Sequence, residues 1–376
     1  MTVDAVGGVW TYVMELAQGL AERGMVITLA TTGVSLRPDQ RDAVTAIPSL
    51  TLHESKLSAD SPDEPWRKSS ALGKWLLDLA TEIRPDIIHL NDYSYAALPW
   101  PAPVLVVGHS CVYSWFEAVK RIRPPVEWDS YRRKVIQGLK AAQGVTAPTH
   151  AMLSTMQKHY GGFHALRCIY HARQSGQFTP LKKEPFIFSA GRLWDEAKNL
   201  VALDRVTSRL AWPVYLAGDD RDPEGHVTQL SGAKKVGRLN ERDLAHWMAR
   251  AAIFSVPARY QPFGLAALEA GLSGCALVLG DIPSLREVWN DAACFVPPDD
   301  DSSLRDCLTV LIEDEQQLAA MGAAARARAL EFTPKRMVDE YLRAYEELRE
   351  QSVSAPAQQS NPTSPLPIQQ EQIVTL

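Results

Sequence analysis

Residues 253–274 read IFSVPARYQPFGLAALEAGLSG and contain the unit on which the fold prediction rests. Ile253–Pro257 is a short, continuous apolar run, the pattern of a β-strand that is buried on both faces. After a loop, apolar residues at helical spacing predict a helix that starts near Pro262 and stops at Gly274. A strand, a loop and a helix in this order form the repeating unit of an α/β protein with a parallel sheet.

The same alternation extends over most of the chain in both directions. Further strands are predicted at Ile27–Thr32, Asp86–Leu90, Val104–His109, Val145–Pro148, Phe186–Gly191, Val214–Gly218, Val236–Leu239, Ala276–Gly280 and Cys294–Pro297. These strands are too numerous for one compact sheet, so we predict two α/β domains, each with a parallel sheet covered on both faces.

The polar stretch 171–184 is the predicted linker between the domains, which then span residues 1–170 and 185–332. Thr333-Pro334 opens a last helix, 333–350, because proline is favoured at the start of helices. Residues 351–376 are rich in Gln, Ser and Pro and are predicted to form a disordered tail. The first strand, within Met1–Ala5, is short, which leaves open whether the natural N-terminus is longer.

Composition excludes several classes of protein. The chain has 376 residues and a net charge of −5, without a basic run, which argues against nucleic-acid binding. Weak peripheral contact with a membrane stays open. No membrane span or signal peptide is visible, so cytoplasmic residence is the default. The five cysteines, Cys111, Cys168, Cys275, Cys294 and Cys307, form no C-x-x-C pair and are predicted to be thiols in a reducing compartment.

Two cations follow the strand that ends at Gly191. Arg192 and Lys198 precede a helix that begins near Asn199. Ligands of open α/β sheets bind beyond the carboxyl ends of the strands, and two cations beside a helix N-terminus suit a diphosphate. The alternative is a solvated loop in which both cations pair with neighbouring carboxylates, Asp195 or Glu196.

The helix predicted after Tyr260 offers a second set of ligand-binding groups. Its first amides, those of Phe263, Gly264 and Leu265, can bind anionic or hydroxyl oxygens. Glu269 lies farther along among apolar residues, where it is either exposed or accepts hydrogen bonds from a diol such as ribose.

The first half of the chain contributes weaker signals. Gly7-Gly8 permits a tight turn and a close approach of backbone to a ligand, although a plain turn explains it equally. His109 ends a predicted strand and is a candidate for function, against the more common structural role of a lone histidine. Asn91 and Asp92 also follow a strand and could face an acceptor, but a role in the turn is favoured.

Other chemistries lack their motifs. The sequence contains neither the G-x-S-x-G elbow of serine hydrolases nor a phosphate-binding P-loop. Asp219-Asp220 follows a strand, but a polar loop is preferred to a metal site. The histidines show no regular metal-ligand spacing with cysteine or acidic residues: His89, His150, His159, His164 and His171. We therefore predict no bound metal and no cofactor.

Taken together and in this order, the motifs resemble those of retaining glycosyltransferases of family 4, particularly bacterial ones. The resemblance runs from Gly7 to about Leu348 and is strongest at Gly191-Arg192-Leu193, Lys198-Asn199 and Gln261–Glu269. It implies the GT-B fold, in which two Rossmann-like, doubly wound domains face a cleft and a final helix crosses back to the first domain.

The resemblance also implies roles for particular residues. Arg192 and Lys198 would bind the donor diphosphate, and Glu269, the second acid of an E-x7-E motif, would hold the nucleotide ribose. Further donor contacts would come from the glycine loop Gly7-Gly8, from His109 near the transferred sugar, from the amides of Phe263, Gly264 and Leu265, and from the backbone around Arg238 against the base.

Two positions depart from the family pattern. Gln261 replaces the first acid of E-x7-E. In the family this acid contacts hydroxyls of the transferred sugar, so Gln261 is a catalytic candidate together with His109, Arg192 and Lys198. Tyr170-His171-Ala172 replaces a common Asn-Gly, a change expected to alter only a turn.

The predicted function is transfer of a sugar from a UDP- or GDP-type donor to a carbohydrate or other hydroxyl acceptor. A weakly active relative that binds nucleotide sugars, and a GT-B-type epimerase or phosphorylase, are the alternatives.

Overall fold

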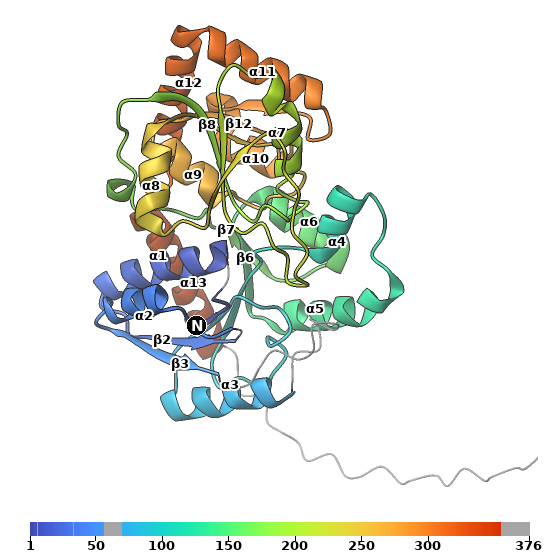
Figure 1. The fold of residues 1–376 in the computed structure, drawn as a ribbon. Helices are drawn as coiled ribbons and strands as arrows, with labels where there is room; N and C mark the ends of the chain where they lie inside the picture. The colour runs from blue at the N-terminus through green and yellow to red at the C-terminus, as the bar shows by residue number, and fades with distance from the viewer. Residues whose placement is uncertain (6, 33, 56–69, 355–376) are drawn as a thin grey trace, which may run out of the picture.

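A computed structural model describes residues 1–5, 7–32, 34–55 and 70–354 of the chain. In its N-terminal half, strands and helices alternate as β1 (Thr2–Val3), α1 (Gly8–Glu22), β2 (Ile27–Thr31), α2 (Pro38–Thr45), β3 (Leu50–Glu54), α3 (Ser70–Ile83), β4 (Ile88–Leu90), β5 (Val104–Val107), α4 (Val112–Trp115), α5 (Asp129–Ala141), β6 (Gly144–Ala147), α6 (His150–Tyr160) and β7 (Ala165–Cys168). The alternation confirms the predicted α/β class (Figure 1).

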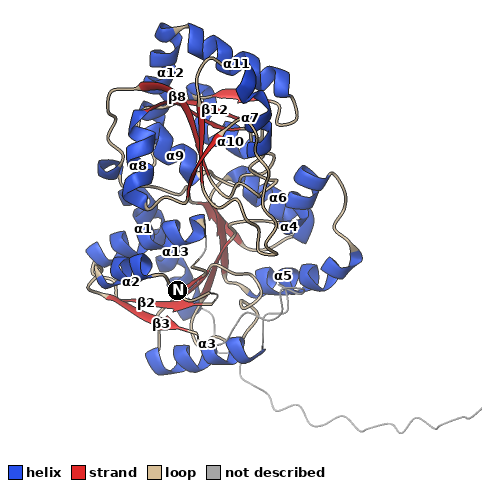
Figure 2. Cartoon of the chain, in the orientation of Figure 1, coloured by secondary structure: helices blue, strands red, loops and turns tan. Residues whose placement is uncertain are grey.

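The C-terminal half repeats the pattern, with β8 (Glu184–Ala190), α7 (Leu200–Val206), β9 (Val214–Ala217), β10 (Lys234–Gly237), α8 (Glu241–Arg250), β11 (Ala251–Val256), α9 (Leu265–Leu272), β12 (Ala276–Gly280), α10 (Pro283–Trp289), β13 (Cys294–Val296), α11 (Asp301–Glu313), α12 (Glu315–Ala329) and α13 (Pro334–Ser354). Helices lie on both sides of the strands (Figure 2), as strands with continuous apolar runs require.

All the strand pairs are parallel, and their order defines where loops converge. The C-terminal sheet has the order β10-β9-β8-β11-β12-β13. The N-terminal half contains the sheets β1-β2-β3 and β4-β5-β6-β7, joined where Nδ2 of Asn91 donates to the carbonyl of Thr2 over 2.6 Å. In the C-terminal sheet the chain moves outward from β8 in both directions, so the loops after β8 and β11 flank the point where ligands bind in such sheets.

Among the described residues, the C-terminal half has one buried hydrophobic cluster and the N-terminal half has two, and α13 belongs to the N-terminal cluster that contains α1. Its buried residues, including Val338 and Tyr341, pack with Tyr12 and Leu16 of α1, and α13 descends beside α1 in Figure 1. Gly19 of α1 allows this approach, since a Cβ there would overlap the side chain of Val338.

The predicted division of the chain into two domains with a linker at 171–184 stays a proposal. The helix continues to Ser354, four residues beyond its predicted end, and the rest of the predicted tail lies outside the described residues.

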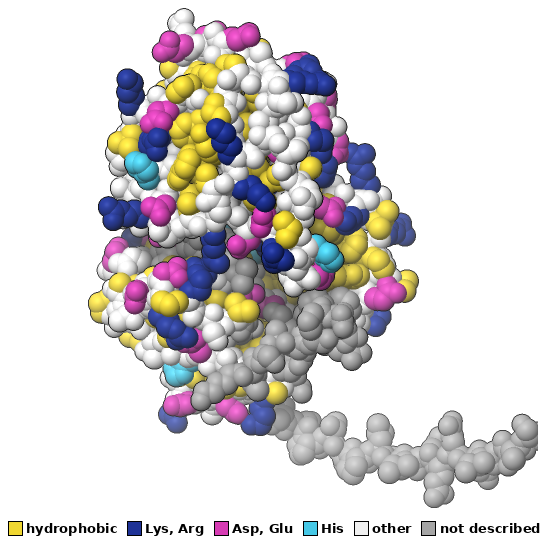
Figure 3. Space-filling model, viewed as in Figure 1, with side chains coloured by type: hydrophobic (Ala, Val, Ile, Leu, Met, Phe, Trp, Pro, Cys, Tyr) yellow, Lys and Arg dark blue, Asp and Glu magenta, His cyan; other side chains and the backbone are white. Residues whose placement is uncertain are grey.

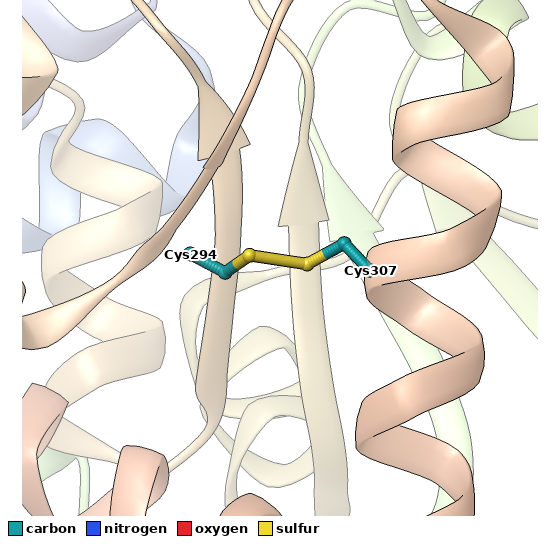
Figure 4. Close-up of a disulfide and its surroundings, with 2 residues drawn as sticks. All are labelled: Cys294 and Cys307. Atoms are coloured by element: carbon teal, nitrogen blue, oxygen red, sulfur yellow. A yellow bond between two sulfur atoms is a disulfide. The ribbon is translucent and has the colours of Figure 1, made fainter.

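The prediction of free thiols is wrong at two of the cysteines. Cys294 on β13 and Cys307 on α11 form a disulfide (Figure 4), with Cα atoms 7.3 Å apart, wider than the usual spacing of about 4.4–6.8 Å. Cys111, Cys168 and Cys275 are free. The two bridged residues lie 13 positions apart without a recognisable motif, so the sequence contained no signal for their pairing.

Two glycines at the carboxyl ends of strands show how tightly the loops there are packed. A Cβ on Gly218, after β9, would overlap the carbonyl of Gly191, and a Cβ on Gly280, at the end of β12, would overlap the backbone of Ala258. Only glycine allows these loops to sit against one another.

We expect Gly280→Ala to lower the free energy of unfolding by about 1–3 kcal/mol, the usual cost of overpacking, because the Ala258 backbone cannot move aside. Gly162→Ala is the matched control, since a Cβ there meets no atom within 4 Å. Chemical denaturation measures both; equal stabilities would contradict the packing described.

Candidate active site

The loops after β8 and β11 are held together by hydrogen bonds. The carbonyl of Ala197 accepts from the amide of Arg259 over 2.9 Å. Asn199, in the left-handed conformation with φ 56°, donates from Nδ2 to the carbonyl of Pro257 over 3.0 Å. The two motifs predicted to bind the donor therefore form one surface.

The two predicted cations differ in their surroundings. Arg192 is half-exposed, pairs with Asp195 over 2.6 Å and stacks over Trp194. This pairing of Arg192 with a carboxylate is what the alternative interpretation, a solvated loop, predicted for it. Nζ of Lys198 instead contacts Oε1 of Gln261, and burial lowers the pKa of Lys198 to about 8. A desolvated ammonium whose contact is a neutral amide retains its attraction for an anion.

The first turns of α1 and α9 meet across the two halves of the chain. Both helices follow a glycine with positive φ, 73° at Gly7 and 99° at Gly264. A Cβ on Gly8 would lie 3.4 Å from Cδ1 of Leu265, so the two helix N-termini are neighbours. Each end presents unpaired amides and the positive end of a helix dipole, and both favour an anion.

Phe263 contributes only its backbone to this surface. Its side chain is 2% exposed and packs against His171, Tyr170 and Phe332. The buried ring anchors the loop before α9, which leaves the amides of Phe263, Gly264 and Leu265 as the groups available to a ligand.

His109 follows β5 and is oriented by Asn91. Because Nδ2 of Asn91 donates to the carbonyl of Thr2, its Oδ1 faces Nε2 of His109 at 2.7 Å. Burial lowers the pKa of His109 to about 3, so the ring is neutral, Nε2 carries the hydrogen and Nδ1 is an acceptor. Asp92 accepts from the amide of Ser94 over 2.8 Å, which is the turn role favoured for it.

His171 does more than complete a turn, so that expectation is wrong. It is buried, stacks on His109 with ring centroids 5.4 Å apart, and lies 4.4 Å from Tyr12 and 5.2 Å from Phe263. It links the loop before α9 to the histidine of the N-terminal half.

The side chain of Glu269 is buried, and one of its carboxylate oxygens is engaged in an ion pair. It is 7% exposed, and its Oε1 lies 2.9 Å from Nε of Arg173, a residue of the predicted linker. Arg238, by contrast, is exposed after the edge strand β10, two strands from β8, and its recorded ion pair is a 4.0 Å contact with Asp219.

Glu287 of α10 joins the halves from the other side. Its carboxylate accepts from the amides of His150 and Ala151 at the start of α6, each over 2.8 Å, and from the hydroxyl of Tyr170 over 2.9 Å. The structure also brings ligand atoms of His150, Cys168 and Glu287 within 4.8 Å of one another, a grouping that the spacing of the histidines did not predict. Because the carboxylate is already engaged in hydrogen bonds, we assign it a structural role.

A cavity of about 390 Å³ is lined by residues of α1, α13 and the linker, with Arg173, Gln174, Phe332 and Val338 among them. It adjoins the site through two residues: Arg173, which contacts Glu269, and Phe332, which packs against Phe263. On the face seen in Figure 3, basic and acidic side chains are interspersed.

Comparison with known proteins agrees with this arrangement. Residues 6–172 match the family described as Glycosyltransferase Family 4, and residues 184–314 match Glycosyl transferases group 1. The structure is similar to sucrose-phosphate synthase from Thermosynechococcus elongatus, with a TM-score of 0.77 at 17% identity over 92% of this chain and 94% of that one. The fold is GT-B, as predicted. The chain belongs to the family 4/group 1 glycosyltransferases.

Two further comparisons are informative. The Anabaena HepE structure in complex with UDP and glucose has a TM-score of 0.71 at 15% identity, over 93% of this chain and all of that one. D-inositol 3-phosphate glycosyltransferase of Nocardioides sp. is 31% identical over 197 residues, which are 47% of this chain and 42% of that protein. The chain thus matches less than half the length of this curated relative. Among the described residues, no helix is both long and apolar enough to cross a membrane.

We expect Glu287→Gln to lower the free energy of unfolding by about 1 kcal/mol, because the amide lacks the charge that favours the N-terminus of α6. Glu331→Gln, which breaks an exposed pair with Arg328, should change stability by less than about 0.5 kcal/mol. Denaturation curves of both variants decide the matter, and indistinguishable losses would contradict a special role for Glu287.

Proposed function

We propose that the protein transfers a sugar from a nucleoside diphosphate sugar to an acceptor hydroxyl with retention of anomeric configuration. The observation that carries this proposal is the meeting of the first turns of α1 and α9 beside Lys198 and Arg192. Two helix N-termini and two cations suit a diphosphate, and its charge grows as the bond to the sugar breaks.

The other site residues then take the roles implied by the family. Amides of Phe263, Gly264 and Leu265 and the Gly7-Gly8 loop bind oxygens of the donor. Neutral His109 accepts a hydrogen bond from a sugar hydroxyl at Nδ1, since Asn91 occupies Nε2. Glu269 accepts from the ribose hydroxyls, and the backbone near Arg238 lies against the base. Leaving-group charge is stabilised by protein groups, and the proposal invokes neither metal nor cofactor.

The donor is proposed to be a UDP- or GDP-type sugar. UDP is favoured by the HepE complex with UDP and glucose, which shares the fold of this chain. Retention without a protein nucleophile implies that the acceptor hydroxyl attacks from the face that the diphosphate leaves. The acceptor is a carbohydrate or another hydroxyl compound.

A panel of nucleotide sugars, assayed for release of nucleoside diphosphate, tests the proposed function directly. Release that depends on an added hydroxyl compound supports it. Donor binding without release would instead indicate an inactive relative, and conversion of the donor without an acceptor an epimerase.

Lys198→Ala should lower kcat/KM by about 100-fold or more, because removal of one group that stabilises leaving-group charge costs about 3 kcal/mol. Its stability should change far less than its activity, since its recorded contact is with a neutral amide. Steady-state kinetics and thermal unfolding together measure this contrast. Unchanged kcat/KM in an active protein would remove Lys198 from the diphosphate site.

Gln261→Glu should raise kcat/KM by about tenfold, mostly in kcat, because a carboxylate stabilises positive character on the sugar ring in the transition state. It should also raise the pKa of Lys198 above its present value of about 8, since Oε1 of Gln261 contacts Nζ. Kinetics of Gln261→Glu and Gln261→Ala on the same donors separate charge from size. A folded Glu variant that gains on no donor would reject Gln261 as a weakened catalytic position.

A further inference from the structure

Arg173 is a buried cation that bridges both halves of the chain. Its side chain is 5% exposed, and Nη1 donates to Oε2 of Glu15 on α1 over 2.9 Å. Nη2 donates to Glu241 at the start of α8, and Nε lies 2.9 Å from Oε1 of Glu269 on α9. The Nε contact is an ion pair whose N–H is not aligned well enough for a hydrogen bond.

The cluster around Arg173 contains more negative than positive charge. Three carboxylates, Glu15, Glu241 and Glu269, face one guanidinium; Glu15 and Glu269 are each 9% exposed in their side chains, while Glu241 is 57% exposed. Removal of Arg173 would leave two buried carboxylates without a counter-charge, which is costly in a protein interior. Arg173 is therefore the counter-charge that favours the ionised form of both buried acids, against the larger effect of burial.

Glu269 is the member that the proposed function uses. The pKa of Glu269 is raised to about 7, mainly by burial; the charges of Glu241 and Glu15 contribute to the increase, and Arg173 opposes it. The recorded contact with Arg173 involves Oε1, and among the described residues no partner is recorded for Oε2. This geometry leaves one carboxylate oxygen for a ligand while the other is held.

We propose that Arg173 is the positioning residue of the donor site: it pairs with Glu269, orients that carboxylate toward the nucleotide ribose and ties it to α1 through Glu15. This proposal rests on the proposed function, in which Glu269 binds the ribose. Because α1 also carries the Gly7-Gly8 loop at its N-terminus, about two turns before Glu15, one cation fixes the relation between the ribose and phosphate subsites.

The dependence of binding on pH tests the proposal. Ionised Glu269 accepts hydrogen bonds more strongly than its neutral form, so affinity should fall as pH drops below about 7. Lys198 faces Asp195 and Arg192 and loses its charge above about pH 8, so affinity should fall again there. UDP-glucose is the probe, because its sugar removes the phosphate ionisation near about pH 6 that free UDP would add.

Three variants separate positioning from bulk stability. Arg173→Gln should move the acidic limb of the binding curve upward by about one pH unit and weaken binding at neutral pH by about tenfold. Arg173→Lys should restore part of this loss. Glu241→Gln removes a like charge, so the acidic limb should move downward, the opposite direction.

Arg167→Gln is the matched control. Arg167 of β7 also bridges two carboxylates, Glu340 and Glu347 of α13, but it is not in contact with Glu269. Its loss should lower stability without moving either limb. Titration calorimetry on the full chain measures all the curves, and circular dichroism checks folding. If Arg173→Gln does not fold, the downward shift in Glu241→Gln carries the test.

A titration without ligand separates this proposal from the proposed function. Carbon-13 NMR of glutamate-labelled protein, with Glu269→Gln to assign the signal, follows the Glu269 carboxyl directly. If the wild type binds no UDP-glucose, the assignment of that donor fails, while an upward shift in Arg173→Gln still supports the Arg173 contact. A Glu269 titration unchanged by Arg173→Gln and by Glu241→Gln would overturn the proposal.

Discussion

The contact between the first turns of α1 and α9 is the constraint on which the rest of the structure depends. Both helices begin after a glycine with positive φ, Gly7 and Gly264, and a Cβ on Gly8 would already stand in van der Waals contact with Leu265. Two helix N-termini of like polarity repel one another, so their approach without a ligand must be held by other contacts. An anion between them turns this unfavourable arrangement into a favourable one, which is why the geometry points to a charged ligand.

The contacts that hold the halves together surround this point. Lys120 pairs with Glu196 over 2.6 Å, the hydroxyl of Thr149 donates to the carbonyl of Pro262 over 3.0 Å, and the amide of Cys111 donates to the hydroxyl of Tyr260 over 2.7 Å. Each of these three contacts is individually weak and partly solvated, unlike the buried Arg173 cluster, which also joins the two halves. The Arg173 cluster, whose separation would leave buried carboxylates without a counter-charge, is therefore the contact between the halves that costs most to break.

The sequence predicted the parts of the fold that local pattern determines. All ten strands predicted from apolar runs are present, with ends displaced by at most two residues. The predictions omitted β3 and β7, which lie at sheet edges, are half-buried and lack continuous apolar runs. Helix α9 begins at Leu265 rather than near Pro262, because Gly264 takes a left-handed conformation that only the tertiary fold determines.

For the site, the roles assigned to residues from the sequence stay predictions, and the partners of these residues could not be predicted. Arg173 lies 96 positions from Glu269 and 158 from Glu15, so nothing local marked it as their counter-ion. The crystal structure of a complex with UDP-glucose is the most direct test. Phosphate oxygens should lie about 3 Å from Nζ of Lys198 and from the first amides of α9, with the Gly7-Gly8 loop alongside. A diphosphate bound in the cavity beside Gln174 and Val338, or beyond the carboxyl end of β10, would contradict this placement of the donor.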